Sequence, residues 1–388
     1  MHVVVVDPGM VGKGGHHLAI NRFLFHQIKT KGHRPLILTS KFFTSAIKDG
    51  LLGFPTFAYS PYTLQDPFIN NLKKFVVYNE NTRTALMQRM PPKRLSHGSV
   101  FIVHIAFGCM LHGFLEYLLL LNRNDIHVRI VLRFPPSGAQ KGNRLADEMW
   151  IAALQQWENV PFDTRFYTDL SSLKHWYESH TPISVGVTPI AVDFSSAPPP
   201  VPMRCEGGLV FGFVGVPREE KGILIIADAI RDHLAQHPDD RFLIQTPRAE
   251  EQIMAVLSSL PDQVTLIDEL LFEESYFSFL ASLDVVLVPY LPKNYRMRTS
   301  HIFMEALGMG KAVITTPDTW MEEQLDAFPS RCGIVMPSTD VVGLHAALRL
   351  MHQHRQEIAE NTAQIAPTIR RQHCRESWFS HIMSGVEE

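Results

Sequence analysis

The segment 289–316 contains residue types that bind anions. A β-branched run, Asp284–Val288, leads into a loop with basic and aromatic side chains, among them Arg298. Thr299 or Ser300 is placed to cap the helix that follows, in which apolar residues recur at helical spacing. A helix N-terminus beside cationic side chains, beyond the carboxyl end of a parallel strand, is a favourable position for a phosphate group.

Glu305 lies about a turn and a half into that helix. A carboxylate there could accept hydrogen bonds from neutral hydroxyl groups beside a bound phosphate. A ligand that combines phosphate with several hydroxyl groups is a nucleotide-sugar. The alternative is an exposed carboxylate that pairs with a residue four positions on, but position 309 is Met.

A glycine-rich loop, residues 12–17 (GKGGHH), follows the first apolar run of the chain. Backbone N–H groups of Gly14 and Gly15, together with His16, could approach a phosphate or a sugar closely. The alternative is a tight strand-to-helix turn. Of His16 and His17, we expect one to face a ligand and the other to pack or be solvated.

A second charged turn, residues 215–222 (GVPREEKG), follows a predicted strand. Arg218 and Lys221 could neutralise a diphosphate there, the arginine with two N–H donors and the lysine as a point charge. The alternative is a solvated charged turn, which is common on protein surfaces.

His104 and Arg133 each stand at the carboxyl end of a predicted buried strand. A single histidine in this position is often a core residue with its hydrogen bonds satisfied. A buried arginine is costly unless it is paired, so Arg133 either reaches a ligand or pairs with a carboxylate. The chain has no Asp-x-Asp sequence to hold Mg²⁺ or Mn²⁺, so we expect no metal in the reaction.

The composition is that of an ordinary globular protein. With 388 residues, a net charge of -3 and a pI of about 6.7, the chain is long enough for two or three domains and is not a general nucleic-acid binder. The four scattered cysteines favour a reducing compartment, and no leader or membrane-spanning run is expected. We therefore expect a cytoplasmic protein. The short patch 71–78 (NLKKFVVY) leaves two alternatives, peripheral membrane contact or a half-buried helix.

Strand and helix patterns alternate throughout the chain, with one interruption. The segment 195–208 (SSAPPPVPMRCEGG) is rich in proline and glycine and predicts a linker, at about 196–208. The expected fold is α/β, with two Rossmann-like, doubly wound parallel-sheet domains facing each other across a cleft. The first would span 1–195 and be joined by a C-terminal helix at about 370–388, and the second would span 209–369.

The motifs in this order resemble those of GT-B-fold glycosyltransferases, most of all the retaining family 4 (group 1) enzymes. The similarity covers nearly the whole chain and rests on the N-terminal glycine loop, a final aromatic helix and four segments: FVGVPREEKG, LASLDVVLVPY, MEALGMGKAVITT and GIVMPSTDVVGLHAAL. The resemblance implies a donor-binding second domain and an acceptor-binding first domain.

The resemblance also implies roles for single residues. Lys221 matches the lysine that binds the donor diphosphate, and Glu305 matches the second of two paired glutamates, which contacts the ribose. The backbone near Thr299, Ser300 and His301 matches the turn that holds the donor phosphate and sugar.

The chain departs from the family pattern at several positions. The first glutamate of the pair is Met297, the arginine after the glycine of the diphosphate turn is Val216, and Arg133 or Phe134 replaces a histidine. Arg218 is two positions beyond Val216 and could act in its place. The expected function is retaining transfer of a hexose from a nucleotide-diphosphate sugar to a glycan, lipid-linked or small-molecule acceptor. The alternative is a degenerate GT-B domain that binds a nucleotide, a glycan or a partner without catalysis.

Overall fold

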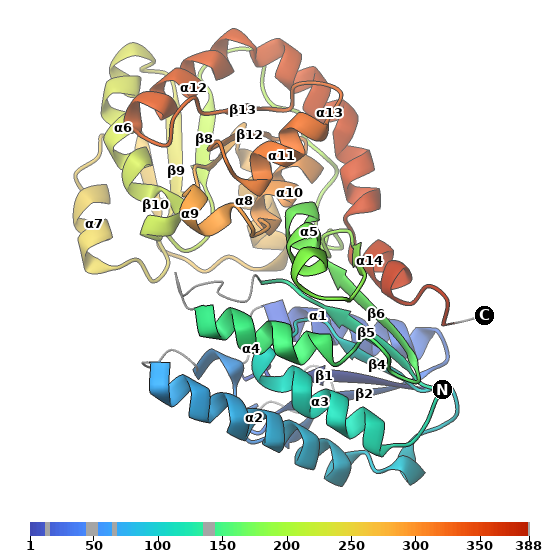
Figure 1. Ribbon diagram of the computed structural model, residues 1–388. Helices are drawn as coiled ribbons and strands as arrows, with labels where there is room; N and C mark the ends of the chain where they lie inside the picture. The colour runs from blue at the N-terminus through green and yellow to red at the C-terminus, as the bar shows by residue number, and fades with distance from the viewer. Residues whose placement is uncertain (12–15, 44–52, 64–67, 135–143, 387–388) are drawn as a thin grey trace. The chain divides into compact units, whose positions relative to one another are not determined.

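The computed structural model describes residues 1–11, 16–43, 53–63, 68–134 and 144–386 (Figure 1). The chain divides into two compact units, Met1–Thr188 with Phe379–Glu388, and Pro189–Trp378. The sequence placed these boundaries at residue 195 and at about residue 370.

The described strands of the first unit form one seven-stranded parallel sheet in the order β3-β2-β1-β4-β5-β6-β7. The strands are β1 His2–Asp7, β2 Arg34–Ser40, β3 Gly53–Phe57, β4 Val100–Val103, β5 His127–Val131, β6 Asp163–Thr168 and β7 Val185–Val187. Because β1 pairs with both β2 and β4, the order of the strands reverses at this point.

Helices cover both faces of this sheet. Helices α2, α3 and α4 lie together on one face and α1 lies on the other (Figure 1). The helical segments are α1 His16–Thr30, η1 Pro61–Thr63, α2 Phe68–Arg89, η2 Pro92–Arg94, α3 Gly108–Leu120, α4 Arg144–Gln155 and α5 Ser171–His180. Coverage on both faces explains the unbroken valine run of β1, since Val3 to Val6 are all fully buried.

The described strands of the second unit form a six-stranded parallel sheet in the order β10-β9-β8-β11-β12-β13. The strands are β8 Val210–Phe213, β9 Arg241–Gln245, β10 Val264–Ile267, β11 Val285–Val288, β12 Ala312–Thr315 and β13 Gly333–Val335. Here the reversal falls at β8, which pairs with both β9 and β11.

The second unit has helices on both sides of its sheet as well. They are η3 Glu219–Lys221, α6 Ile223–Gln236, α7 Glu251–Leu257, α8 Glu273–Ser282, α9 Pro292–Tyr295, α10 His301–Gly308, α11 Trp320–Ala327, α12 Val341–Gln353 and α13 Arg355–Gln372. Helix α14, Arg375–Ile382, crosses the boundary between the units. A hydrophobic core joins α6 and α12 to the sheet through residues such as Ile226, Leu234 and Met351.

The predicted fold class is confirmed, and two details differ from expectation. Strand β3 was not predicted, because its sequence GFPTF contains Pro55; the strand lies at the edge of the sheet, where proline is tolerated. The segment 195–208 forms no helix or strand, as expected of a linker, but it is fixed to the second unit. Met203 is buried in the core of that unit, and Arg204 pairs with the buried carboxylate of Asp284 at 2.6 Å.

Helices α2 and α3 approach each other closely at Gly113. Its N–H donates to Asn79 Oδ1 at 2.9 Å, and a Cβ at this position would lie 1.8 Å from the backbone oxygen of Asn79. We predict that Gly113→Ala lowers the free energy of unfolding by about 1–3 kcal/mol, because the helices must move apart. Thermal denaturation measures this as a melting temperature lower by several degrees. Leu120→Ala, at an exposed position of α3, is the control and should change little; equal melting temperatures for the two variants would contradict the close approach.

Candidate functional site

Two loops meet at the carboxyl edge of the second sheet, where β8 and β11 lie side by side. The loop after β8 begins at Gly215 and ends at Gly222, both with positive φ. A Cβ on Gly222 would lie 2.1 Å from the carbonyl oxygen of Pro289, and Leu291 N–H donates to the Glu220 carbonyl at 2.9 Å. The two segments that the sequence singled out, 215–222 and 289–300, are therefore directly joined.

Lys221 is the central cation of this edge. Its Nζ lies 5.6 Å from the centre of the Tyr290 ring, and a Cβ on Gly215 would be 3.3 Å from Nζ. Burial, followed by the charge of Arg218, lowers the pKa of Lys221 to about 8. A bound anion would favour the protonated amine, so this lysine is well placed to attract one.

Arg218 and Arg298 lie on either side of one carboxylate. A guanidinium nitrogen of Arg218 is 3.6 Å from one oxygen of Glu220, and one of Arg298 is 3.8 Å from the other oxygen. Arg298 also lies over the ring of Tyr295, 4.7 Å from its centre. A groove at this edge is lined by Val216, Arg218, Glu219, Arg248, Lys293 and their neighbours. Its lining holds the cations Arg218, Arg248 and Lys293 together with the carboxylates Glu219, Glu220 and Glu250.

Helix α10 begins at the same edge. Ser300 is its N-cap and accepts a hydrogen bond from the Phe303 N–H at 3.2 Å, as the sequence predicted. Thr299 and His301 flank Ser300 and are half-buried. The partial positive charge of the helix N-terminus adds to that of Lys221.

Glu305 is half-buried and accepts a hydrogen bond from the hydroxyl of Tyr276, on α8, through Oε2. Burial raises the pKa of Glu305 to about 7, although the bond from Tyr276 acts in the opposite direction. Asp193 and Arg375 form an ion pair nearby and also influence this pKa. Glu305 is thus a carboxyl group held in place, through Oε2, by a second helix.

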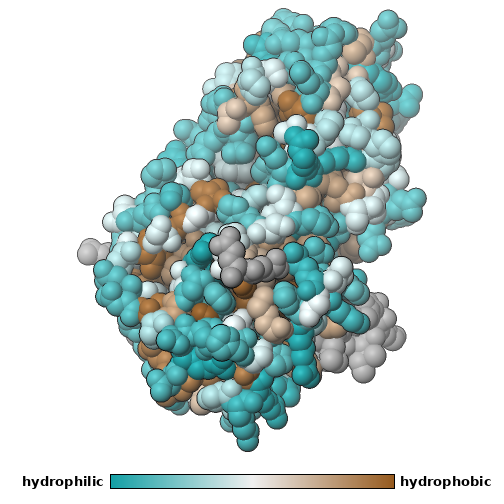
Figure 2. Space-filling view, turned by 90° about the vertical axis from the view of Figure 1, so that its right-hand side faces the viewer, coloured by the Kyte–Doolittle hydropathy of each residue, from teal (hydrophilic) through white to brown (hydrophobic). Residues whose placement is uncertain are grey.

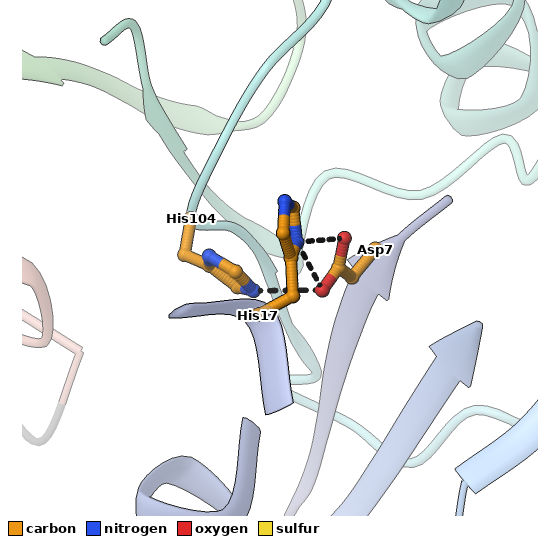
Figure 3. A group of neighbouring side chains, drawn as sticks. All are labelled: Asp7, His17 and His104. Atoms are coloured by element: carbon orange, nitrogen blue, oxygen red, sulfur yellow. Dashed lines mark hydrogen bonds and ion pairs between the residues drawn. The ribbon is translucent and has the colours of Figure 1, made fainter. Parts of the chain in front are cut away.

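A second cluster lies in the first unit, again where the strand order reverses. Figure 3 shows Asp7 at the end of β1, His17 at the start of α1 and His104 just after β4. The Nδ1 atom of His17 is 2.8 Å from Asp7 Oδ1, and the Nε2 atom of His104 is 3.1 Å from Asp7 Oδ2. Gly9 N–H and the Asn21 side-chain amide also donate to this carboxylate, at 3.0 and 2.6 Å.

These contacts fix the protons of both rings. Each histidine donates to Asp7 from one nitrogen, which leaves His17 Nε2 to accept from the Tyr62 hydroxyl at 2.5 Å. Burial lowers the pKa of His104 and raises that of Tyr62 to about 12. The cluster is therefore an Asp–His pair whose outer nitrogen can take a proton from a hydroxyl group.

Two further predicted residues, Arg133 and His16, lie near this second cluster. Arg133, after β5, pairs with the buried carboxylate of Asp169 at 3.7 Å. Of the two predicted alternatives for this arginine, a ligand or a carboxylate, the structure shows the carboxylate. The ring of His16 is centred 6.4 Å from that of His104. Gly14 and Gly15 lie outside the described residues.

Sequence reasoning missed Asp7 and Tyr276, which position the predicted His104 and Glu305. A signal for Asp7 was present, because a carboxylate that ends a fully apolar strand must be buried and so needs partners. Nothing comparable marks Tyr276, which is 29 positions from its partner.

The family comparison supports the motifs of the second unit. Residues 208–354 match the family described as glycosyl transferases group 1. No curated protein matches the chain by sequence.

Solved structures share the fold over almost the full length. Sucrose-phosphate synthase from Thermosynechococcus elongatus is 12% identical, with a TM-score of 0.68 and coverage of 98% of this chain and 97% of that one. Trehalose-6-phosphate synthase OtsA is 12% identical with a TM-score of 0.70, covering 100% and 99%. Anabaena Alr3699/HepE in complex with UDP is 12% identical with a TM-score of 0.68, covering 100% of both chains.

These likenesses show that the chain has the GT-B fold, and they confirm the resemblance to group 1 glycosyltransferases that the motifs indicated. Among the described helices, none combines the length and apolar character that crossing a bilayer would require.

The raised pKa of Glu305 predicts a specific pH dependence of stability. The native state binds the Glu305 proton more tightly than the unfolded chain does, so its contribution to stability is complete below about pH 4.5 and is lost as the pH rises through about 7. We predict that Glu305→Gln flattens the decline of melting temperature over this interval. Glu357→Gln, which removes an exposed ion pair with Arg331, is the control. A curve for Glu305→Gln parallel to that of the unchanged protein would show that Glu305 titrates normally.

Proposed function

We propose that this chain, a GT-B protein whose second unit matches group 1 glycosyltransferases, transfers a hexose from a nucleotide-diphosphate sugar to an acceptor. The observation that carries the proposal is the position of Lys221. A desolvated lysine lies between two joined loops at the carboxyl edge of the sheet, beside the N-terminus of α10. Ligands of doubly wound sheets bind at such reversals of strand order.

In the proposed mechanism, the second unit holds the donor. Lys221, Arg218 and the N-terminal turn of α10, with Thr299, Ser300 and His301, bind the diphosphate and stabilise its charge as the sugar bond breaks. Glu305 accepts hydrogen bonds from the ribose hydroxyls through Oε1, while Tyr276 holds Oε2. Arg298 replaces part of its contact with Glu220 by a contact with the phosphate. No metal takes part in these steps.

We further propose that transfer proceeds with retention of configuration. The departing phosphate, neutralised by Lys221, would then take the proton of the acceptor hydroxyl. The Asp7–His17 pair offers a second base, since the outer nitrogen of His17 is an acceptor. If His17 took that proton, direct displacement with inversion would be favoured instead.

The acceptor is proposed to be a glycan, a lipid-linked or a small molecule bound by the first unit, in a cytoplasmic protein. Peripheral membrane contact is part of this proposal. The patch 71–78 lies in α2, where Val76 and Val77 are 59% and 49% exposed beside Lys73. The face drawn in Figure 2 is mostly hydrophilic, with hydrophobic patches that are separated from one another.

Met297 favours a second candidate, a GT-B domain that binds a nucleotide or glycan, or a partner, without catalysis. It is half-buried in the turn before Ser300, where it offers no carboxylate for a transferred sugar. This candidate shares the donor site and differs only in turnover.

Calorimetry with UDP tests the donor site first, because UDP is the nucleotide in the Anabaena structure. We predict that Lys221→Ala weakens UDP binding at least tenfold, about 1.4 kcal/mol, because it removes a charge-assisted contact to phosphate. Arg231→Ala removes a cation on α6 that contacts Ser259 instead and should bind UDP normally. GDP and ADP are tried in the same way. Equal UDP affinities for both variants, or no binding of any nucleotide, would contradict the proposed site. If the nucleotide-sugars bind but are neither hydrolysed nor used for transfer, the second candidate, a binding domain without catalysis, is favoured.

The anomeric configuration of the first-formed product tests the stereochemistry. We predict that NMR will show a product with the anomeric configuration of the donor. We also predict that His17→Ala slows transfer but leaves this configuration unchanged, because His17 would position the acceptor hydroxyl. His112→Ala, which removes an exposed histidine paired with Glu116, is the control. If the product had the inverted configuration and no longer formed in His17→Ala, retention would be refuted. The Asp7–His17 pair would then be the base that takes the proton of the acceptor hydroxyl.

A further inference from the structure

We propose that His233, Asp240 and His352 form a binding site for a transition-metal ion such as Zn²⁺ in the second unit. His233 is in the last turn of α6, Asp240 directly precedes β9, and His352 is in the last turn of α12. The Nε2 atoms of both histidines lie 2.8 Å from the same oxygen of Asp240, Oδ2. Three ligands of two types suited to zinc, imidazole and carboxylate, thus converge from three segments of the chain.

The site is buried, and the carboxylate of Asp240 gives it a negative charge that would attract a cation. Asp240 is 1% exposed and His233 is 2% exposed. Burial alone would raise the pKa of Asp240, but hydrogen bonds from His233, His352 and the Leu209 N–H hold it below its ordinary value. The carboxylate is therefore ionised at neutral pH. With two neutral imidazoles the cluster has one negative charge, which a divalent cation would more than offset.

The distances require only a small adjustment for a metal. With metal–nitrogen and metal–oxygen bonds of about 2.0–2.1 Å, ligands in a tetrahedron lie about 3.3 Å apart. The imidazole nitrogens, at 2.8 Å from Oδ2, would retreat by about 0.5 Å on this basis. In each neutral imidazole the proton would move, by exchange with solvent, from Nε2 to Nδ1, which leaves the Nε2 lone pair to bind the metal.

His237 lies beside the three ligands and could supply a fourth if its ring turned. This residue caps the C-terminus of α6, and its ring is stacked on that of His352 at 4.2 Å and on that of His233 at 4.8 Å. Burial and the two neighbouring imidazoles lower the pKa of His237, which keeps its nitrogens available as ligands. A turn of this half-buried ring, or a water molecule, completes a tetrahedron.

The Asp7 cluster has a similar set of groups but is less suited to a metal. Its carboxylate also accepts from Gly9 and Asn21, and the outer nitrogen of His17 is occupied by Tyr62. By contrast, Asp240 Oδ2 receives only the two imidazoles among the bonds recorded for the described residues. The His233 cluster can open toward a metal without breaking a backbone contact.

The role of the metal would be structural. Asp240 Oδ1 accepts from the Leu209 N–H at 2.7 Å, just before β8 begins, so the site lies at the amino edge of the sheet. The candidate donor site lies at the opposite, carboxyl edge. A metal would join the C-terminal ends of α6 and α12 to the starts of β8 and β9, and transfer itself would not depend on it.

Titration of the full chain with Zn²⁺ alone tests this assignment. The protein carries no histidine tag and is first stripped with a chelator. We expect one ion to bind per chain with micromolar or tighter affinity, a melting temperature higher by several degrees, and visible absorption bands of four-coordinate Co²⁺ when cobalt replaces zinc. Nucleotide binding should be the same with and without metal.

Three variants locate the ion. His352→Gln keeps a hydrogen-bond donor for Asp240 but removes a metal ligand, so the fold should persist while Zn²⁺ affinity falls at least tenfold. His345→Ala, on the same helix and paired with Asp232, should bind Zn²⁺ normally. The absence of stoichiometric binding, unchanged affinity in His352→Gln, or loss of binding in His17→Gln instead would overturn the proposal.

Discussion

The reversal of strand order between β8 and β11 is the constraint on which the candidate donor site depends. Chain segments leave these neighbouring strands in opposite directions, so the space beyond their carboxyl ends is not filled by a crossing helix. Two loops can meet there only if their backbones fit. Gly222 allows this, since any side chain would strike the Pro289 carbonyl. The position of Lys221 follows from that single glycine.

Buried carboxylates organise the histidines of both units in the same way. An ionised group inside a protein must be paired and hydrogen-bonded, and histidine is a partner that can donate while remaining neutral. Asp7 holds two imidazoles at the carboxyl edge of the first sheet, and Asp240 holds two at the amino edge of the second. The two clusters lie at opposite kinds of sheet edge, and this agrees with their different proposed roles. The Asp7 cluster is at the edge where ligands of such sheets bind, whereas the Asp240 cluster lies beside the C-terminal ends of α6 and α12.

The sequence was sufficient for the architecture because apolar runs identify strands buried on both faces, and because the motifs at strand ends are local. For the same reason it narrowed the N-cap to Thr299 or Ser300, of which the structure has Ser300, and it placed the turn 215–222 at the end of a strand. It was not sufficient for pairs such as Glu305 with Tyr276, or Asp7 with His104, which are 97 positions apart. Those depend on which helices and strands become neighbours, and that is decided by packing rather than by local pattern. The burial of Met203, within the segment 195–208, was beyond the sequence for the same reason, since it depends on a core formed by later residues.

Met297 gains a physical meaning from the charges around it. Lys221, Arg218 and Arg298 face Glu220, and a glutamate at 297 would place a second carboxylate near the same loops. With methionine there, the loops gain no further carboxylate near Lys221, whose pKa is lowered first by burial and then by the charge of Arg218. Such an edge is most stable with an anion bound. Under the proposed function, diphosphate binding therefore does not require the missing glutamate, and the contacts that select the sugar would come instead from backbone groups near Ser300.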